Sequence, residues 1–239
     1  MKQIAAIFAL CLLSSFLAAQ GIGGKAGIGG KAGVGGGAVA GGTALFSETF
    51  TGSTLCYSGF GNHCDNTWYY MQGTITFGTG TATLATGTGA NMQAATGNWA
   101  PQSQVWQTAA VNMGSFGDYP VLVFNNLAYS TDCSLHTYDA TQLYVKQTGG
   151  TQQTLTSLTL ATGTTYYYKL RAQVGTGTNA QCQGWYSTDG TTWNAVPTST
   201  DGTWTTNMAV IGLSAGGTNW IDSHVCVNNA DITHGTSCP

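Results

Sequence analysis

Apolar and polar residues alternate with a period of two from Ala44 to the end of the chain. β-Branched and aromatic residues fill the alternating positions, and turn-forming Gly, Asn, Asp and Thr interrupt them about every 8 to 12 residues. No segment keeps its apolar residues at helical spacing. The pattern predicts strands at residues 45–50, 73–77, 81–86, 103–113, 119–130, 140–147, 152–160, 164–174, 181–188, 191–196, 208–215 and 220–232.

About a dozen strands are too many for a small immunoglobulin domain, but they suit a jelly roll. We therefore predict an all-β fold, a two-sheet antiparallel jelly-roll β-sandwich over residues 43–239. One domain of that length can bury a substantial core.

The first 42 residues follow a different pattern. Residues 1–20 combine a basic start at Lys2, an apolar run and a small-residue end, which is typical of a secretory signal peptide. Residues 21–42 are glycine-rich and repeat GIGGKA, which predicts a flexible tether because ordering glycine is costly in backbone entropy. The alternative is that this repeat self-associates or binds the cell envelope. We expect a protein that is secreted or at the cell surface, without a membrane span, because the apolar run is shorter than the roughly 20 residues of a transmembrane helix.

Six cysteines remain after removal of the signal peptide, and an even number in an oxidising compartment predicts disulfides. They are Cys56, Cys64, Cys133, Cys182, Cys226 and Cys238. Cys56 with Cys64 is the favoured pair, because Gly59 and Gly61 allow the loop between them to turn back tightly. Cys133–Cys182 and Cys226–Cys238 follow by elimination. Cysteine-bound zinc is the weaker alternative, because the spacing of zinc ligands is absent.

Charged residues make up 6% of the chain, against about 25% in typical domains. From Thr43 onward the basic residues are Lys146, Lys169 and Arg171, and against nine acidic residues they give a net charge of −6. Such a domain lacks the basic surface that tracks phosphates, so nucleic acid is not an expected partner.

Alternation also predicts which side chains point away from the core. Trp106, Tyr144, Lys146, Arg171 and Trp185 all fall on the non-core side of their strands. Aromatic rings beside cationic donors suit carbohydrate, because the rings stack on C–H groups and the donors hold oxygen atoms. We predict that Trp106, Tyr144, Arg171 and Trp185 share one concave, solvent-facing sheet surface that, with Lys146, binds an extracellular glycan or another polymer. The alternative is an ordinary outer face, where such side chains only stabilise strand pairing.

Residues 164–196 carry the clearest motifs, a strand of form wY-LR and then a strand ending in S-DG-tW. With the opening LFSETF and the closing AVIGLSAGGTNWIDSHVCV, they resemble strands of laminin-G-like and concanavalin A-like lectin/glucanase domains. The resemblance implies a concanavalin A-like sandwich with no required cofactor. It also allows a structural calcium ion in the loops, with Asp65, Asn66 and Asp222 as candidate ligands.

The segment STDGTTW, from Ser187 to Trp193, contains an Asp-Gly pair. We predict a type I′ hairpin turn there, because both residues tolerate positive φ. The segment also resembles the Asp box of β-propellers, but propellers repeat that motif and this sequence contains it once.

Catalysis has less support in the sequence than binding. Glycoside hydrolases place two carboxylates across the scissile bond, whereas Glu48 is the only glutamate here. Asp118, Asp132 and Asp139 leave open a hydrolase or lyase with atypical acids. Four histidines are scattered singly, His63, His136, His224 and His234, and no Gly-X-Ser-X-Gly segment indicates a nucleophile. We expect a secreted, non-catalytic module that binds carbohydrate or another extracellular polymer; a structural or adhesive surface protein without a small ligand is the other alternative.

Overall fold

The computed structural model describes residues 44–68, 70–85, 90–95, 103–125, 132–200, 202–204, 210–215 and 220–228. In residues 44, 90–95, 119, 203–204, 210–215 and 220–228 it describes the backbone only. The predicted signal peptide and tether, and Cys238, lie outside the described residues. The described part of the chain contains no helix long and apolar enough to cross a membrane.

The larger sheet has eight strands. They are β1 (Ala44–Glu48), β5 (Ile75–Gly78), β6 (Thr81–Leu84), β8 (Gln104–Met113), β13 (Thr165–Gln173), β15 (Gln181–Ser187), β16 (Asn194–Ala195) and β19 (Trp220–Asn228). Their spatial order is β16, β15, β13, β8, β19, β6 and β5, and β1 pairs with β19. All these pairings are antiparallel.

The second sheet has seven strands, also antiparallel. In spatial order they are β12 (Gln153–Leu155), β11 (Gln142–Gln147), β10 (Asp132–Asp139), β9 (Tyr119–Asn125), β18 (Val210–Ala215), β7 (Ala90–Ala95) and β4 (Tyr70–Gln72). Two short pairs complete the strands, β2 (Thr54–Leu55) with β3 (Asn62–Cys64) and β14 (Gly175–Thr176) with β17 (Thr203–Trp204). A 3-10 turn, η1, spans Gly177–Asn179.

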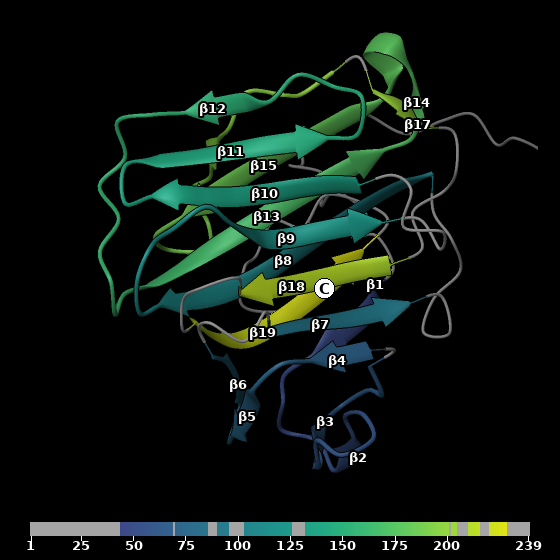
Figure 1. Cartoon of the computed structure of the whole chain (residues 1–239), viewed down its shortest axis with the longest axis vertical. Coiled ribbons are helices and arrows are strands. Elements are labelled where there is room, and N and C mark those ends of the chain that lie inside the picture. Colours follow the sequence, from purple (N-terminus) through teal and green to yellow (C-terminus); the bar gives the residue numbers. More distant parts are fainter. Residues whose placement is uncertain are drawn as a thin grey trace, which may run out of the picture. The chain divides into compact units, whose positions relative to one another are not determined.

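The hydrophobic core lies between the two large sheets, which pack face to face (Figure 1). Val105 and Ala109 of β8 bury against the core from one sheet, and Leu143 and Val145 of β11 from the other. The members of each pair are four and two residues apart, respectively, and an even spacing puts both on one side of the strand. Burial of each larger side chain contributes about 1.5–3 kcal/mol, so alternation at many such positions stabilises the sandwich.

Two of the three predicted disulfides are confirmed. Cys56 bonds Cys64 with the Cα atoms 5.1 Å apart, and Gly59 and Gly61 in the loop have φ of 89° and 86°, which only glycine adopts at little cost. Cys133 of β10 bonds Cys182 of β15 with the Cα atoms 5.5 Å apart, so this disulfide joins the two sheets.

The third disulfide stays a prediction. The backbone of Cys226 lies in β19, and Cys238 lies outside the described residues.

The prediction of a type I′ turn at Asp189-Gly190 is wrong. Gly190 has a φ of 74°, but Asp189 is not at positive φ, as a type I′ turn requires. The Asp189 carboxylate instead accepts the backbone N–H groups of Thr191 and Thr192, at 2.8 and 2.7 Å. This local hydrogen bonding shapes a longer loop between β15 and β16.

Candidate functional site

A tryptophan–lysine cluster lies on the outer face of the eight-stranded sheet. It comprises Trp106, Lys169, Arg171, Trp185 and Trp193. Arg171 of β13 is opposite Trp106 of β8, and Lys169 is opposite Trp185 of β15, so strand pairing brings these side chains to one face. The Trp106 and Trp185 rings stack with their centroids 5.4 Å apart. The structure thus brings together three of the side chains that the sequence proposed as one surface.

The protein's own cations occupy this cluster. Lys169 Nζ lies 5.5, 4.9 and 4.6 Å from the ring centroids of Trp106, Trp185 and Trp193, within the range of cation–π attraction. Arg171 Cζ lies 5.4 Å from the Trp106 centroid. Trp106 is only 6% exposed and Lys169 only 4%. Because these ring faces contact Lys169 and Arg171, we interpret the cluster as structural.

Tyr144 and Lys146 lie elsewhere, in β11 of the seven-stranded sheet. The prediction that Tyr144 shares one surface with Trp106, Arg171 and Trp185 is therefore wrong. Alternation fixes the side of a strand on which a residue lies, but it does not decide in which sheet the strand pairs.

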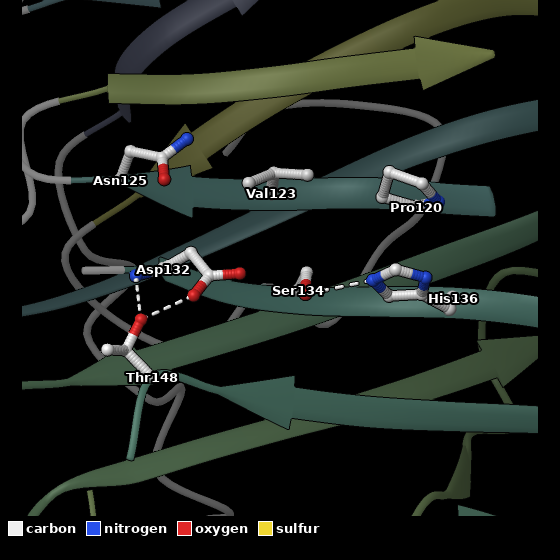
Figure 2. Close-up of a pocket in the computed structure, with 7 residues that line it drawn as sticks. All are labelled: Pro120, Val123, Asn125, Asp132, Ser134, His136 and Thr148. Atoms are coloured by element: carbon white, nitrogen blue, oxygen red, sulfur yellow. Dashed lines mark hydrogen bonds between the residues drawn. The ribbon is translucent and has the colours of Figure 1, made fainter. Parts of the chain in front are cut away.

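A pocket of about 420 Å³ opens on the outer face of the seven-stranded sheet (Figure 2). Asp132, Ser134 and His136 line it from β10; being two residues apart, they lie on one side of the strand. The remaining lining residues are Pro120, Val123, Asn125 and Thr148. This is the His136 pocket, and its neighbours on β11 are Tyr144, opposite His136, and Lys146, opposite Ser134.

Hydrogen bonds hold the side chains at both ends of the pocket. At one end Thr148 Oγ1 donates to Asp132 Oδ1 at 2.5 Å and accepts the Asp132 N–H at 2.9 Å. At the other end His136 Nε2 lies 3.0 Å from Ser134 Oγ, and His136 Nδ1 lies 2.8 Å from the Tyr144 hydroxyl. The Tyr144 ring also stacks on the imidazole, with centroids 4.5 Å apart, and fixes the orientation of His136.

Asp118 completes the contacts of His136. The Tyr144 hydroxyl donates to Asp118 Oδ1, and the same oxygen lies 3.4 Å from His136 Nδ1. Burial lowers the pKa of His136, although the Asp118 charge opposes this shift. Burial, together with the hydrogen bond to Asp118, raises the pKa of the Tyr144 hydroxyl. At neutral pH the imidazole is therefore uncharged and Tyr144 is protonated.

Asp118 and Asp132 lie toward opposite ends of the pocket, because Asp118 contacts His136 and Asp132 precedes His136 by four residues of β10, about 13 Å along an extended strand. Glycosidase carboxylates lie about 5–9.5 Å apart, so this backbone spacing does not favour a glycosidase pair. Asp139 is a turn residue, because its carboxylate accepts the Thr141 N–H at 2.6 Å.

Glu48 is a structural residue at the end of β1. Its carboxylate is fully buried, and Oε1 accepts the N–H groups of Phe50 and Asp65, both at 2.8 Å. Oε2 accepts the Asn66 N–H at 3.0 Å and Trp68 Nε1–H at 3.3 Å. Four donors thus hold the one glutamate and tie the segments that follow β1 and β3 to this strand.

The calcium site stays a prediction. The Asp65 carboxylate accepts the Thr49 N–H at 2.5 Å, and Asn66 Nδ2 donates to the Ser47 carbonyl at 2.5 Å. Only the backbone of Asp222 is described, in β19. In the described part of the chain no three His, Cys, Asp or Glu side chains could hold a metal ion together.

The sequence prediction missed the strand that carries the pocket. Core-facing and outward-facing residues alternate over 132–136, with Cys133 and Leu135 buried in the core and Ser134 and His136 on the outer face. That alternation was the signal that could have predicted the strand. It was overlooked because most residues of the segment are polar. Neither Ser134 nor His136 was proposed as a site residue.

Comparisons with known proteins bear on the fold. No protein-family model and no curated protein matches the sequence. The exoplasmic/lumenal domain of VIP36, in a Ca2+-bound form, aligns with a TM-score of 0.50 and 9% identity over 82% of this chain and 96% of that chain. A legume lectin-like domain from Entamoeba histolytica aligns at 0.47 and 10% identity over 69% and 91%. A variant of alginate lyase Aly36B, in complex with alginate trisaccharide, aligns at 0.45 and 11% identity over 63% and 81%.

The VIP36 alignment covers most of both chains, and at 9% identity it concerns the fold and not the ligand. It agrees with the two packed antiparallel sheets and the core between them. The chain therefore has the two-sheet jelly-roll sandwich fold of concanavalin A-like lectins.

Proposed function

We propose that the chain binds carbohydrate, or another hydroxyl-rich extracellular polymer, in the His136 pocket. The observation that carries the proposal is the lining of the pocket. A carboxylate, an amide, an imidazole and two hydroxyl groups reach it from neighbouring strands, beside the apolar surfaces of Pro120 and Val123. Small-molecule sites commonly combine apolar walls with a few polar groups that fix the orientation of the ligand.

An exposed aromatic ring next to the pocket supports the same ligand class. Tyr138 follows His136 by two residues on β10, and its electrostatic effect on Tyr144 places it near the ring that stacks on His136. It is 51% exposed, whereas the rings of the tryptophan–lysine cluster already contact Lys169. A ring of this kind offers a stacking surface to the apolar face of a sugar.

We also infer that the protein acts outside the reducing cytosol. The two disulfides support this, because disulfides persist in oxidising compartments. The apolar start of the sequence agrees with export.

A glycan array tests the proposal with two matched variants. Asn125→Ala removes an amide that lines the pocket, and Arg171→Ala removes a cation from the tryptophan–lysine cluster on the other sheet. Binding that is lost in Asn125→Ala and kept in Arg171→Ala supports the pocket. The reverse pattern would move the site to the tryptophan–lysine cluster, and no binding by the folded wild-type protein would favour the structural or adhesive alternative.

A further inference from the structure

Three side chains at one end of the His136 pocket lie in a row. Ser134 Oγ lies 3.0 Å from His136 Nε2, and on the far side of the imidazole Nδ1 lies 3.4 Å from Asp118 Oδ1. The serine and the histidine belong to β10, and Asp118 comes from the segment just before β9. A hydroxyl, an imidazole and a carboxylate in this order are the parts of a serine nucleophile with its base and its orienting group.

The Tyr144 hydroxyl fixes the proton positions along this row. Its single proton goes to Asp118 Oδ1, because an ionised carboxylate can only accept. The Tyr144 oxygen, 2.8 Å from His136 Nδ1, then serves as an acceptor, so Nδ1 carries the imidazole proton. This leaves a lone pair on Nε2, and the Ser134 hydroxyl donates to it. The hydrogen-bond network thus assigns the tautomer in which His136 can take the serine proton.

We propose that Ser134 is a nucleophile, activated by His136 and oriented by Asp118, which hydrolyses esters of short-chain carboxylic acids bound in the His136 pocket. The alcohol part of the ester is a carbohydrate hydroxyl, and this half of the inference rests on the proposed function. The substrate class is therefore an O-acylated sugar or polysaccharide.

The surroundings of His136 favour its role as base. Burial lowers the pKa of His136, which keeps the imidazole neutral and able to accept a proton at neutral pH. The charges of Asp118 and Asp132 raise the pKa of His136, whereas the charge of Lys146 lowers it, as burial does. When Nε2 takes the serine proton, the nearby Asp118 carboxylate stabilises the imidazolium.

The chemistry needs only the ester and water. Ser134 Oγ bonds to the carbonyl carbon while its proton passes to His136 Nε2. The tetrahedral intermediate then expels the sugar oxygen, which takes that proton, and the acyl group remains on Ser134. Water attacks the acyl carbon and gives a proton to Nε2; breaking the carbon–Oγ bond returns a proton to Ser134. One ester and one water thus give one carboxylic acid and one free hydroxyl.

The pocket offers places for the remaining parts of the substrate. Val123 is opposite Ser134 on β9, and Val123 and Pro120 provide an apolar wall for a short acyl chain. Asn125 lies diagonally across from Ser134 on the same face, where its amide is the candidate donor to the oxyanion. Ser134 is itself only 2% exposed, so the acyl group must enter the pocket to reach its Oγ.

A fluorophosphonate probe tests the nucleophile directly, because an activated serine displaces fluoride from it and keeps the label. We expect labelling of the full chain at Ser134, located by peptide mass spectrometry, and hydrolysis of p-nitrophenyl acetate. Ser134→Ala should abolish the label and lower the hydrolysis rate about a thousandfold or more. Ser58→Ala, at an exposed loop serine, is the matched control and should leave both unchanged.

Asp118→Asn tests the orienting role, which differs from a merely structural one. Without the negative charge beside Nδ1, the acid limb of the pH–rate profile should move to lower pH as the rate falls, because Asp118 raises the pKa of His136. A rate that falls without any move of the acid limb would overturn this role.

A wild-type protein with native circular dichroism but no label on Ser134 would overturn the nucleophile. Glycan-array binding separates this failure from that of the proposed function. Glycan binding without labelling removes the esterase and leaves the binding site in place. Labelling and ester hydrolysis without glycan binding would leave the nucleophile and remove the carbohydrate as the alcohol.

Discussion

Replacing Glu48 with glutamine tests whether this buried carboxylate holds the segments that follow β1 and β3. The two carboxylate oxygens accept two N–H groups each, from Phe50 and Asp65 on one side and from Asn66 and Trp68 on the other. The glutamine amide has the same shape but only one oxygen. Glu48→Gln therefore places an NH2 group against two of these four donors.

The size of the effect follows from those two donors. Each buried donor left without an acceptor costs about 1–3 kcal/mol, which gives about 2–6 kcal/mol for the pair. Removing a buried negative charge recovers part of its desolvation cost. We expect Glu48→Gln to lower the free energy of unfolding by about 2–4 kcal/mol.

Urea denaturation at pH 7 measures this change, and the fluorescence of Trp68, whose indole N–H bonds Glu48, contributes to the signal. Asp139→Asn is the matched carboxylate-to-amide control. It retains an oxygen that can accept the Thr141 N–H in an exposed turn, so a change of about 0.5 kcal/mol or less is expected. A Glu48→Gln protein as stable as the control would refute the argument that the four donors require a carboxylate.

Three further predictions concern stability. Replacing Cys133 and Cys182 with alanine should cost about 4 kcal/mol in thermal denaturation, as expected for cysteines separated by 49 residues, and a loss below about 1 kcal/mol would argue against the chain-entropy account. Lys169→Met keeps the aliphatic stem but removes the cation–π contacts, so it should lower stability by about 1–2 kcal/mol, and an unchanged melting temperature would show that the charge contributes nothing. Gly184→Ala would place a Cβ 2.6 Å from a leucine of the facing sheet and should cost about 1–3 kcal/mol by overpacking; calorimetry that finds no loss would show that the core can yield there.

The sequence alone determined the features that depend on neighbouring residues. Period-two alternation placed Val105 in the core and Trp106 on the outer face, because successive side chains of a strand point to opposite sides. Glycines in a short loop predicted the Cys56–Cys64 disulfide, because closing that loop needs only local backbone freedom. The number of strands and the turn spacing were enough for the sandwich fold.

Only the tertiary structure decided which strands are neighbours. Strand pairing put Tyr144 beside His136 on the seven-stranded sheet, away from Trp106 and Trp185, although all four obey the same alternation. It also placed Lys169 among the tryptophan rings, which made a structural cluster of what the sequence indicated as a binding surface. The physical reason is that alternation is a property of one strand, whereas pairing depends on contacts between residues far apart in the chain.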